Sequence, residues 1–128
     1  MHLTLERPDH DYFLRGADGQ AARVNDRRLT ASFVLAPDTL LESWPVTEAR
    51  TLSAEQLAPV LALSPEVILL GSGATQVFPP AATLAACLGR GIGLEVMTNA
   101  AAARTFNVLA GEGRRVVAGF ILNPQDGS

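Results

Sequence analysis

The sequence is poor in cysteine and in basic charge. Cys87 is the single cysteine among 128 residues, so no disulfide can form within the chain, and a reducing compartment fits best. Ten basic side chains against thirteen acidic ones give a formal charge of -3. Proteins that bind nucleic acid need a basic stripe that outweighs its surroundings, and this balance argues against such a partner. We therefore expect a cytoplasmic protein that does not bind nucleic acid.

The chain also lacks the signals that send a protein into or across a membrane. Its N-terminus, MHLTLERPDHDYF, is acidic and interrupted by Pro8, unlike the basic and then apolar layout of a signal peptide. No apolar run approaches the roughly 20 residues that span a bilayer. The expectation is no transmembrane segment and at most a peripheral association with a membrane.

Apolar residues make up 48% of the chain, which is enough for one core in a domain of this length. We therefore predict a single domain over residues 1–128, with a strand-rich half at 1–52, an alternating half at 53–122 and a polar tail at 123–128. In the first half, β-branched and aromatic residues favour strands, and glycine and asparagine favour turns. The predicted strands are 12–14, 29–35, 40–44 and 46–52, and the predicted turns are 16–19 and 25–26.

The second half alternates helices with strands. The predicted elements are a helix at 54–63, a strand at 66–70, a helix at 81–88, a strand through 96, a helix at 100–110 and a strand at 115–122. Ser53 and Gln56 have the spacing of a capping box, and Pro79-Pro80 suits the first turn of a helix. The segment from Val67 to Val96 reads as a βαβ unit with parallel strands, which gives an α/β fold class.

Two strand ends of this βαβ unit fall on the same edge of the sheet. Gly71-Ser72-Gly73 follows the first strand, and Met97-Thr98-Asn99 follows the second. Ligands of open α/β sheets usually bind at this carboxyl edge. The glycine loop resembles a phosphate-binding turn but lacks the third glycine of a dinucleotide fingerprint and the Gly-Lys-Ser/Thr of a P-loop. A tight turn that needs small residues is the alternative interpretation.

No catalytic constellation is evident. Ser72 lacks the G-x-S-x-G spacing of a hydrolase, and His2 and His10 both lie in the N-terminal segment. Cys87 lies in an apolar helix with no histidine downstream, so we expect a buried structural thiol. No cluster of ligand residues has the spacing of a metal site. We predict no catalytic residue, no metal and no cofactor, and the balance favours a binding protein over an enzyme.

The alanine-rich helix carries two polar candidates. Its apolar stripe is formed by Ala102, Phe106, Leu109 and Ala110. Arg104 lies on the other side, and Asn107 is one turn away from it. One interpretation leaves Arg104 in solvent or paired with Glu112 or another acid. The other joins Arg104 and Asn107 to the Thr98 cap as a polar patch for an anion or a partner.

The stretch from Glu66 to Leu109 resembles the signature region of a small, mostly uncharacterised α/β family that includes the mitochondrial respiratory complex I assembly factor 3. The matching elements are Gly71 and Gly73, Phe78-Pro79-Pro80, Gly91-x-Gly93-x-Glu95-x-Met97 and Arg104-Thr105-x-Asn107-x-Leu109. This resemblance implies a three-layer single domain with a mixed central sheet, a C-terminal βαβαβ half and an additional layer from the strand-rich half.

The chain departs from many relatives at the signature. It has Thr98-Asn99 where they have Asp-Thr, Ala103 where they have cysteine, and Phe106 where they have tyrosine. These changes remove a thiol and a phenol, so a covalent mechanism shared by the family is in doubt here. The remaining groups suit a recognition surface better than a reaction centre.

Three functional hypotheses follow. The first is a non-enzymatic binding or assembly module with a protein partner, in the biogenesis of a bacterial respiratory complex. The second is a site for a small anion or metabolite, enzymatic or not, at the carboxyl edge of the sheet. The third is a purely structural homo-oligomer. The candidate binding residues are Gly71, Ser72, Gly73, Thr98, Asn99, Arg104 and Asn107.

Overall fold

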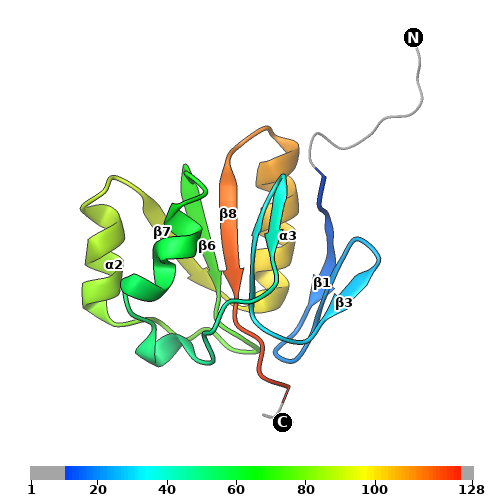
Figure 1. Ribbon diagram of the computed structural model, residues 1–128, viewed down its shortest axis with the longest axis horizontal. Coiled ribbons are helices and arrows are strands. Elements are labelled where there is room, and N and C mark those ends of the chain that lie inside the picture. Colours follow the sequence, from blue (N-terminus) through cyan, green and yellow to red (C-terminus); the bar gives the residue numbers. More distant parts are fainter. Residues whose placement is uncertain (1–10, 125–128) are drawn as a thin grey trace.

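The computed structural model describes residues 11–124 and contains two β-sheets with helices against them (Figure 1). The five-stranded sheet has the order β5-β4-β8-β6-β7, and the three-stranded sheet has the order β1-β2-β3. The five strands are β4 (Phe33–Ala36), β5 (Thr39–Leu41), β6 (Val67–Gly71), β7 (Gly93–Met97) and β8 (Val116–Phe120). Strands β8, β6 and β7 are parallel, and β4 is antiparallel to both of its neighbours. The predicted α/β fold with a mixed central sheet is confirmed.

One face of the central sheet is covered by the small sheet and by α3 (Asn99–Gly111). The strands of the small sheet are β1 (Leu14–Ala17), β2 (Ala22–Val24) and β3 (Arg27–Leu29). Phe33 and Phe120 stack in this core with ring centroids 5.0 Å apart, and Phe106 of α3 is fully buried in the same cluster. The N-terminal residues therefore form a layer of their own on the central sheet.

The other face is covered by shorter elements. These are η1 (Ala49–Thr51), η2 (Glu55–Leu57), α1 (Ala58–Leu61) and α2 (Ala81–Leu88). Trp44 packs flat on β8 at Gly119, where a Cβ atom would lie 2.6 Å from the indole ring. The indole Nε1 donates a hydrogen bond to the carbonyl oxygen of Gln56 at 2.8 Å, which fixes the ring in place. Only glycine leaves room for this contact.

The structure agrees closely with the sequence in the second half. The βαβ unit is β6-α2-β7, and its strands pair in parallel from Val67 with Gly93 to Gly71 with Met97. The predicted capping box is present. The Gln56 amide oxygen accepts from the backbone N–H of Ser53 at 2.9 Å, and the Ser53 hydroxyl accepts from the N–H of Gln56 at 3.2 Å. The helix that follows is nevertheless divided into η2 and the single turn of α1.

Two predicted strands of the first half are wrong. The strand at 29–35 is two strands in different sheets, because β3 ends at Leu29 and β4 begins at Phe33. Ser32 marks this break, where its hydroxyl donates to the carbonyl of Val46 at 2.6 Å and accepts from the N–H of Leu122 at 3.0 Å. The segment 46–52 is not a strand but irregular backbone followed by η1. Its buried residues recur every third position, at Val46, Ala49 and Leu52, as on a helical turn.

The remaining differences in the first half are shifts of boundaries. Strand β1 begins and ends later than predicted, and the turn after it starts at Asp18, whose carboxylate accepts from the N–H groups of Gln20 and Ala21. The turn at 25–26 is confirmed, with Asn25 at a φ of 53°. The predicted strand at 40–44 ends at Leu41, since the chain then turns to place Trp44 on the sheet. His2, His10 and tail residues 125–128 lie outside the described residues.

Candidate functional site

The carboxyl ends of three parallel strands meet at one edge of the central sheet. Gly71 at the end of β6 pairs with Met97 on one side and with Phe120 on the other. The sequence predicted this juxtaposition for β6 and β7, and β8 joins them. The segments that leave these strands therefore start side by side.

Asn99 joins three of the segments at this edge. It is fully buried, and its Nδ2 donates to the carbonyl oxygens of Asp18 at 2.8 Å and Ile121 at 2.9 Å. Its Oδ1 accepts from the N–H of Gly73 at 3.2 Å. Gly71 lies so close to this amide that an added Cβ would overlap Oδ1. Asn99 was predicted as a binding residue, but all three of these bonds are made inside the protein.

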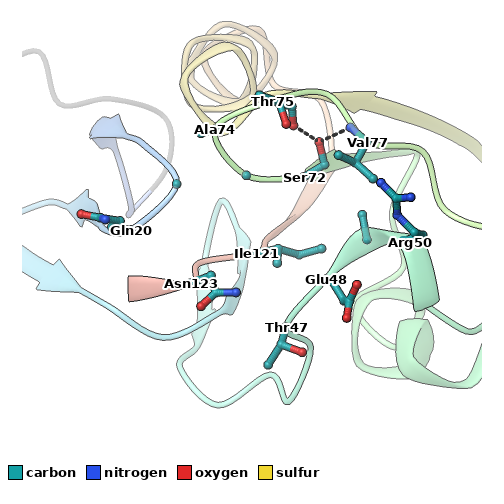
Figure 2. Close-up of a pocket in the computed structure, with 13 residues that line it drawn as sticks. Gln20, Thr47, Glu48, Arg50, Ser72, Ala74, Thr75, Val77, Ile121 and Asn123 are labelled. Atoms are coloured by element: carbon teal, nitrogen blue, oxygen red, sulfur yellow. Dashed lines mark hydrogen bonds between the residues drawn. The ribbon is translucent and has the colours of Figure 1, made fainter. Parts of the chain in front are cut away.

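Ser72 is likewise occupied by the backbone around it. Its hydroxyl donates to the carbonyl oxygen of Thr75 at 2.8 Å and accepts from the N–H of Val77 at 2.9 Å, as Figure 2 shows. Its own N–H donates to the carbonyl oxygen of Met97 at 2.9 Å. These bonds close the loop after β6, which also contains Gly73 at a φ of 118°. The serine shapes the loop and is not oriented as a nucleophile.

Thr98 begins α3 as predicted. Its Oγ1 accepts a hydrogen bond from the backbone N–H of Ala101 at 3.2 Å, which satisfies one of the free amides at the start of a helix. The role seen in the structure is thus the capping of α3.

A cleft of about 470 Å³ opens above this edge (Figure 2). Its walls are the turn at 19–20, the segment 47–50, the loop from Ser72 to Val77, and the residues Ile121 and Asn123 that follow β8. The polar residues that line it are Gln20, Thr47, Glu48, Arg50, Ser72, Thr75 and Asn123. The glycine loop thus lines a concave surface, and the charged side chains beside it come from the segment 47–50.

Arg50 is the cationic group of this cleft. In Figure 2 its guanidinium extends from η1 toward Val77 of the loop, whereas the Glu48 carboxylate points the other way. Arg50 is exposed, and between residues 11 and 124 it has no hydrogen-bond or ion-pair partner. The guanidinium is therefore available to an anion. Sequence analysis missed this residue because residues 46–52 were expected to form a strand, and no local pattern distinguishes Arg50 from the other arginines.

Arg104 and Asn107 do not lie at the carboxyl edge. They line a groove of about 520 Å³ between α3 and β1, together with Phe13 and Arg15. Arg104 is exposed and has no hydrogen-bond or ion-pair partner in the described part of the chain, so of the two alternatives considered, solvent or a pair with an acid such as Glu112, the structure shows the first there. Arg104 and Asn107 thus line the groove beside β1, whereas the glycine loop lines the cleft at the carboxyl edge. The structure does not join them in a single polar patch.

Asn107 differs further from expectation. Its Oδ1 accepts from the N–H of Leu14 at 2.9 Å, and its Nδ2 donates to the carbonyl oxygen of Leu14 at 2.7 Å. The side chain thereby pairs with β1 as a neighbouring strand would, and it fastens the small sheet to α3. Asn107 is therefore held by β1, and its place in a recognition surface stays a prediction.

The sequence matches, over residues 14–121, the profile of a family described as a protein of unknown function (DUF498/DUF598). The chain belongs to this family. Among solved structures, a Xanthomonas campestris protein is 56% identical, with 97% of this chain and 94% of that chain covered and a TM-score of 0.83. A Bordetella pertussis protein described as a Mth938-like domain is 27% identical, with 100% and 98% covered and a TM-score of 0.77. Both solved structures share the fold of this DUF498/DUF598 chain.

One relative of the DUF498/DUF598 chain has a name that refers to a membrane. It is the "13 kDa major membrane protein" of Francisella tularensis subsp. holarctica (strain LVS), 30% identical over 71 residues. The match covers 56% of this chain and 58% of that protein. Between residues 11 and 124, no helix combines the length and the apolarity that crossing a membrane requires.

The other candidate chemistry is limited. Within the described residues, no group of three or more histidine, cysteine, aspartate or glutamate side chains could hold a metal ion. Cys87 lies in α2 and is buried in the core cluster under that helix's inner face, as expected for a structural thiol. Burial raises the pKa of this thiol, and the nearby Arg90 charge opposes the rise only in part. Both burial and the raised pKa disfavour the reactive thiolate.

We predict that Cys87 reacts slowly with a soluble alkylating reagent in the folded protein. Reaction requires both access and the thiolate form, and the side chain is 1% exposed. The measurement is the rate of mass increase with iodoacetamide near neutral pH. The urea-unfolded chain supplies the rate of a free thiol. Equal rates in the two states would show that the thiol is accessible and that its assignment to the core is wrong.

Proposed function

We propose that this protein is a non-enzymatic binding module whose carboxyl-edge cleft receives an anionic group of a partner. The observation that carries the proposal is Arg50, which lines the cleft without an acceptor among the described residues. A guanidinium offers a fork of N–H donors that matches a carboxylate in two parallel hydrogen bonds. Ala74 and Thr75 also line the cleft, and their backbone N–H groups have no acceptor among the described residues.

The groups in the cleft support binding more than catalysis. Nucleophilic catalysis needs a nucleophile within hydrogen-bond reach of a base. The Ser72 hydroxyl is bonded to the backbone of Thr75 and Val77, and among the described residues Glu48 is the one acidic side chain that lines the cleft. We therefore assign Gly71, Thr98 and Asn99, together with the Ser72–Gly73 loop, to holding the cleft in shape rather than to chemistry.

The same contacts would hold a small metabolite. The cleft volume of about 470 Å³ falls in the range of pockets for small molecules. A free carboxylate ligand is thus a second candidate, and it shares its chemistry with an acidic side chain of a protein. A titration with succinate, followed by amide NMR, distinguishes the two sources. Saturable shifts confined to residues 19–20, 47–50 and 72–77 would favour the metabolite.

We further propose that the partner belongs to the assembly of respiratory complex I. The resemblance of residues 66–109 to the family of the mitochondrial assembly factor supports this role. The name of the Francisella relative is compatible with a cytoplasmic protein that associates peripherally with a membrane. Deleting the gene should lower the amount of assembled complex I on native gels. Normal assembly of complex I in the deletion strain would rule out this role. It would not bear on the proposal that the cleft binds an anionic group.

Arg104 is proposed as a second contact for a protein partner. It is exposed beside the groove of about 520 Å³, and no described residue neutralises it. A protein that reaches both the cleft and this groove would contact two guanidinium groups, whereas a small metabolite would contact Arg50 alone. Arg104 variants therefore also separate the two kinds of partner.

Replacing Arg50 by glutamine should weaken capture of the partner by about tenfold, since a hydrogen bond to a charged group contributes about 1.5–3 kcal/mol. The fold should survive, because exposed substitutions usually cost less than about 0.5 kcal/mol. The measurement is quantitative capture on immobilised protein, with urea unfolding in parallel. Arg90→Gln, which makes the same charge change just after α2, is the matched control. Undiminished capture by Arg50→Gln would refute the proposed role of the cleft.

A further inference from the structure

Three arginines gather on the outer face of the three-stranded sheet, which lies at the right of Figure 1. Arg23 on β2 is directly opposite Arg28 on β3, and Gly16 on β1 is opposite Arg23 on its other side. Arg15 lies at an irregularity in the pairing of β1 with β2, between Leu14 and Gly16. All three arginines are exposed, whereas Leu14, Ala22, Val24 and Leu29 beside them in the strands are buried in the core.

This arrangement is electrostatically unfavourable in the isolated protein. Like charges directly opposite each other on neighbouring strands destabilise a sheet. Other arginines of the fold form ion pairs with acids, namely Arg27 with Glu42, Arg114 with Glu66 and Arg115 with Asp38. Arg23 and Arg28, in contrast, have no hydrogen-bond or ion-pair partner among residues 11–124. Positive charge therefore accumulates on one face of a chain whose net charge is -3.

One acid, Asp18, lines the same cleft as the three arginines. Asp18 accepts hydrogen bonds from the N–H groups of Gln20 and Ala21, and these bonds hold the pKa of its carboxyl below the usual range. The charge of Arg28 lowers this pKa further, although the two side chains form no ion pair. The ionised carboxylate of Asp18 offsets one of the three arginine charges, so the cluster keeps a net positive charge.

The space between the arginines suits a compact anion. Arg15, Arg23 and Arg28 line a cleft of about 280 Å³ whose other residues, apart from Asp18, are glycine or alanine. At Gly16 the space where a side chain would be is open, so a ligand can approach the backbone. Arg15 Nε donates to the carbonyl oxygen of Asn25 at 3.0 Å, which holds that side chain against the hairpin.

Arginine is the only basic residue type in the chain, since all ten basic residues are arginines. Each guanidinium can donate two parallel hydrogen bonds to a tetrahedral oxyanion. We propose that Arg15, Arg23 and Arg28 form a binding site for a phosphate group. The group can belong to a soluble phosphate compound or to the head group of an anionic lipid. This site shares no residue with the carboxyl-edge cleft and does not depend on its function.

The test compares the full chain with its Arg23→Gln/Arg28→Gln variant. Titration with inorganic phosphate should give saturable amide shifts at residues 15–18 and 22–29, and the double variant should bind at least about tenfold more weakly. Its urea midpoint should be unchanged or higher, because the like-charge pair is relieved. Arg90→Gln/Arg114→Gln carries the same change of two charges and should bind like the unmodified chain.

Flotation with vesicles identifies the source of the phosphate. Vesicles of phosphatidylcholine with phosphatidic acid should carry the protein, but not the double variant, if the ligand is a lipid. Phosphate shifts without flotation would assign the site to a soluble compound. The proposal is overturned if neither phosphate nor vesicles bind, or if the double variant binds both as well as the control does. An Arg50→Gln variant that retains these shifts would show that the two sites are independent.

Discussion

Replacing Asn99 by alanine should lower the free energy of unfolding by about 3–5 kcal/mol. The side chain is fully buried, and its loss leaves the carbonyl oxygens of Asp18 and Ile121 and the N–H of Gly73 without their partner. Each buried polar group left unsatisfied costs about 1–3 kcal/mol. Urea unfolding monitored by Trp44 fluorescence and by circular dichroism gives the free energy. A loss below about 1 kcal/mol would contradict the bonding described here.

Gly71 offers a control for this assignment. A Cβ at position 71 would overlap the Asn99 amide oxygen, so Gly71→Ala should destabilise the protein when Asn99 is present. When Asn99 is alanine, that overlap is removed, and the same substitution should cost less. Residues in contact are expected to show such an interaction energy in a double-mutant cycle. Additive effects would mean that the two residues do not touch.

The position of Asn99 also connects stability with the proposed cleft. The Asn99 amide bonds to three segments, which are the turn after Asp18, the loop at Gly73 and the chain at Ile121. All three segments form walls of the cleft. A site held within a fraction of an ångström needs such supporting bonds around it. Asn99 is therefore a positioning residue for the cleft, although it does not line it.

The second half of the fold was predictable because its signals are local. Val67 to Leu70 is a continuous apolar run, typical of a strand covered on both faces, and β6 lies inside the central sheet. Thr98 begins α3 with a side-chain cap, and Pro80 precedes α2. A βαβ unit built from these elements has parallel strands. The carboxyl ends of parallel strands lie at the same edge of the sheet, and this is the edge where the cleft lies.

The first half was less predictable because tertiary contacts decide it. The β-branched and aromatic residues of 29–35 favour one strand, but the buried hydroxyl of Ser32 bonds to Val46 and Leu122 and divides the segment between two sheets. In residues 46–52, β-branched residues indicated a strand, whereas the spacing of Val46, Ala49 and Leu52 fits a helical turn. A count of the spacing between apolar residues in this segment would have indicated a helical turn rather than a strand.

The candidate site shows the same limit. The strand ends identified the correct edge, yet Arg50 reaches it from a segment whose path the sequence does not reveal. Asparagine is equally ambiguous, because its amide can face a ligand or replace a backbone pairing. Asn99 and Asn107 both bond to distant backbone groups, 81 and 93 residues away in sequence, so no local pattern could have assigned them.

The α3 surface gives the last prediction, a fixed order of stabilities among three alanine variants. Phe106→Ala should cost about 3–5 kcal/mol, because the ring is fully buried between the two sheets. Asn107→Ala should cost about 1–3 kcal/mol, since the N–H and carbonyl of Leu14 lose their partner. Arg104→Ala should cost less than about 0.5 kcal/mol, because the side chain is exposed and has no described partner.

Partner capture should not follow this order. Arg104→Ala should weaken capture while the urea midpoint stays near that of the unmodified chain, whereas any loss with Asn107→Ala should be accompanied by lower stability. Midpoints and capture measured on the same preparations separate recognition from folding, and Arg90→Ala controls for the lost charge. If Arg104→Ala destabilises the domain as much as Phe106→Ala does, Arg104 is a structural residue. Recognition at the α3 groove would then lose the side chain on which it depends.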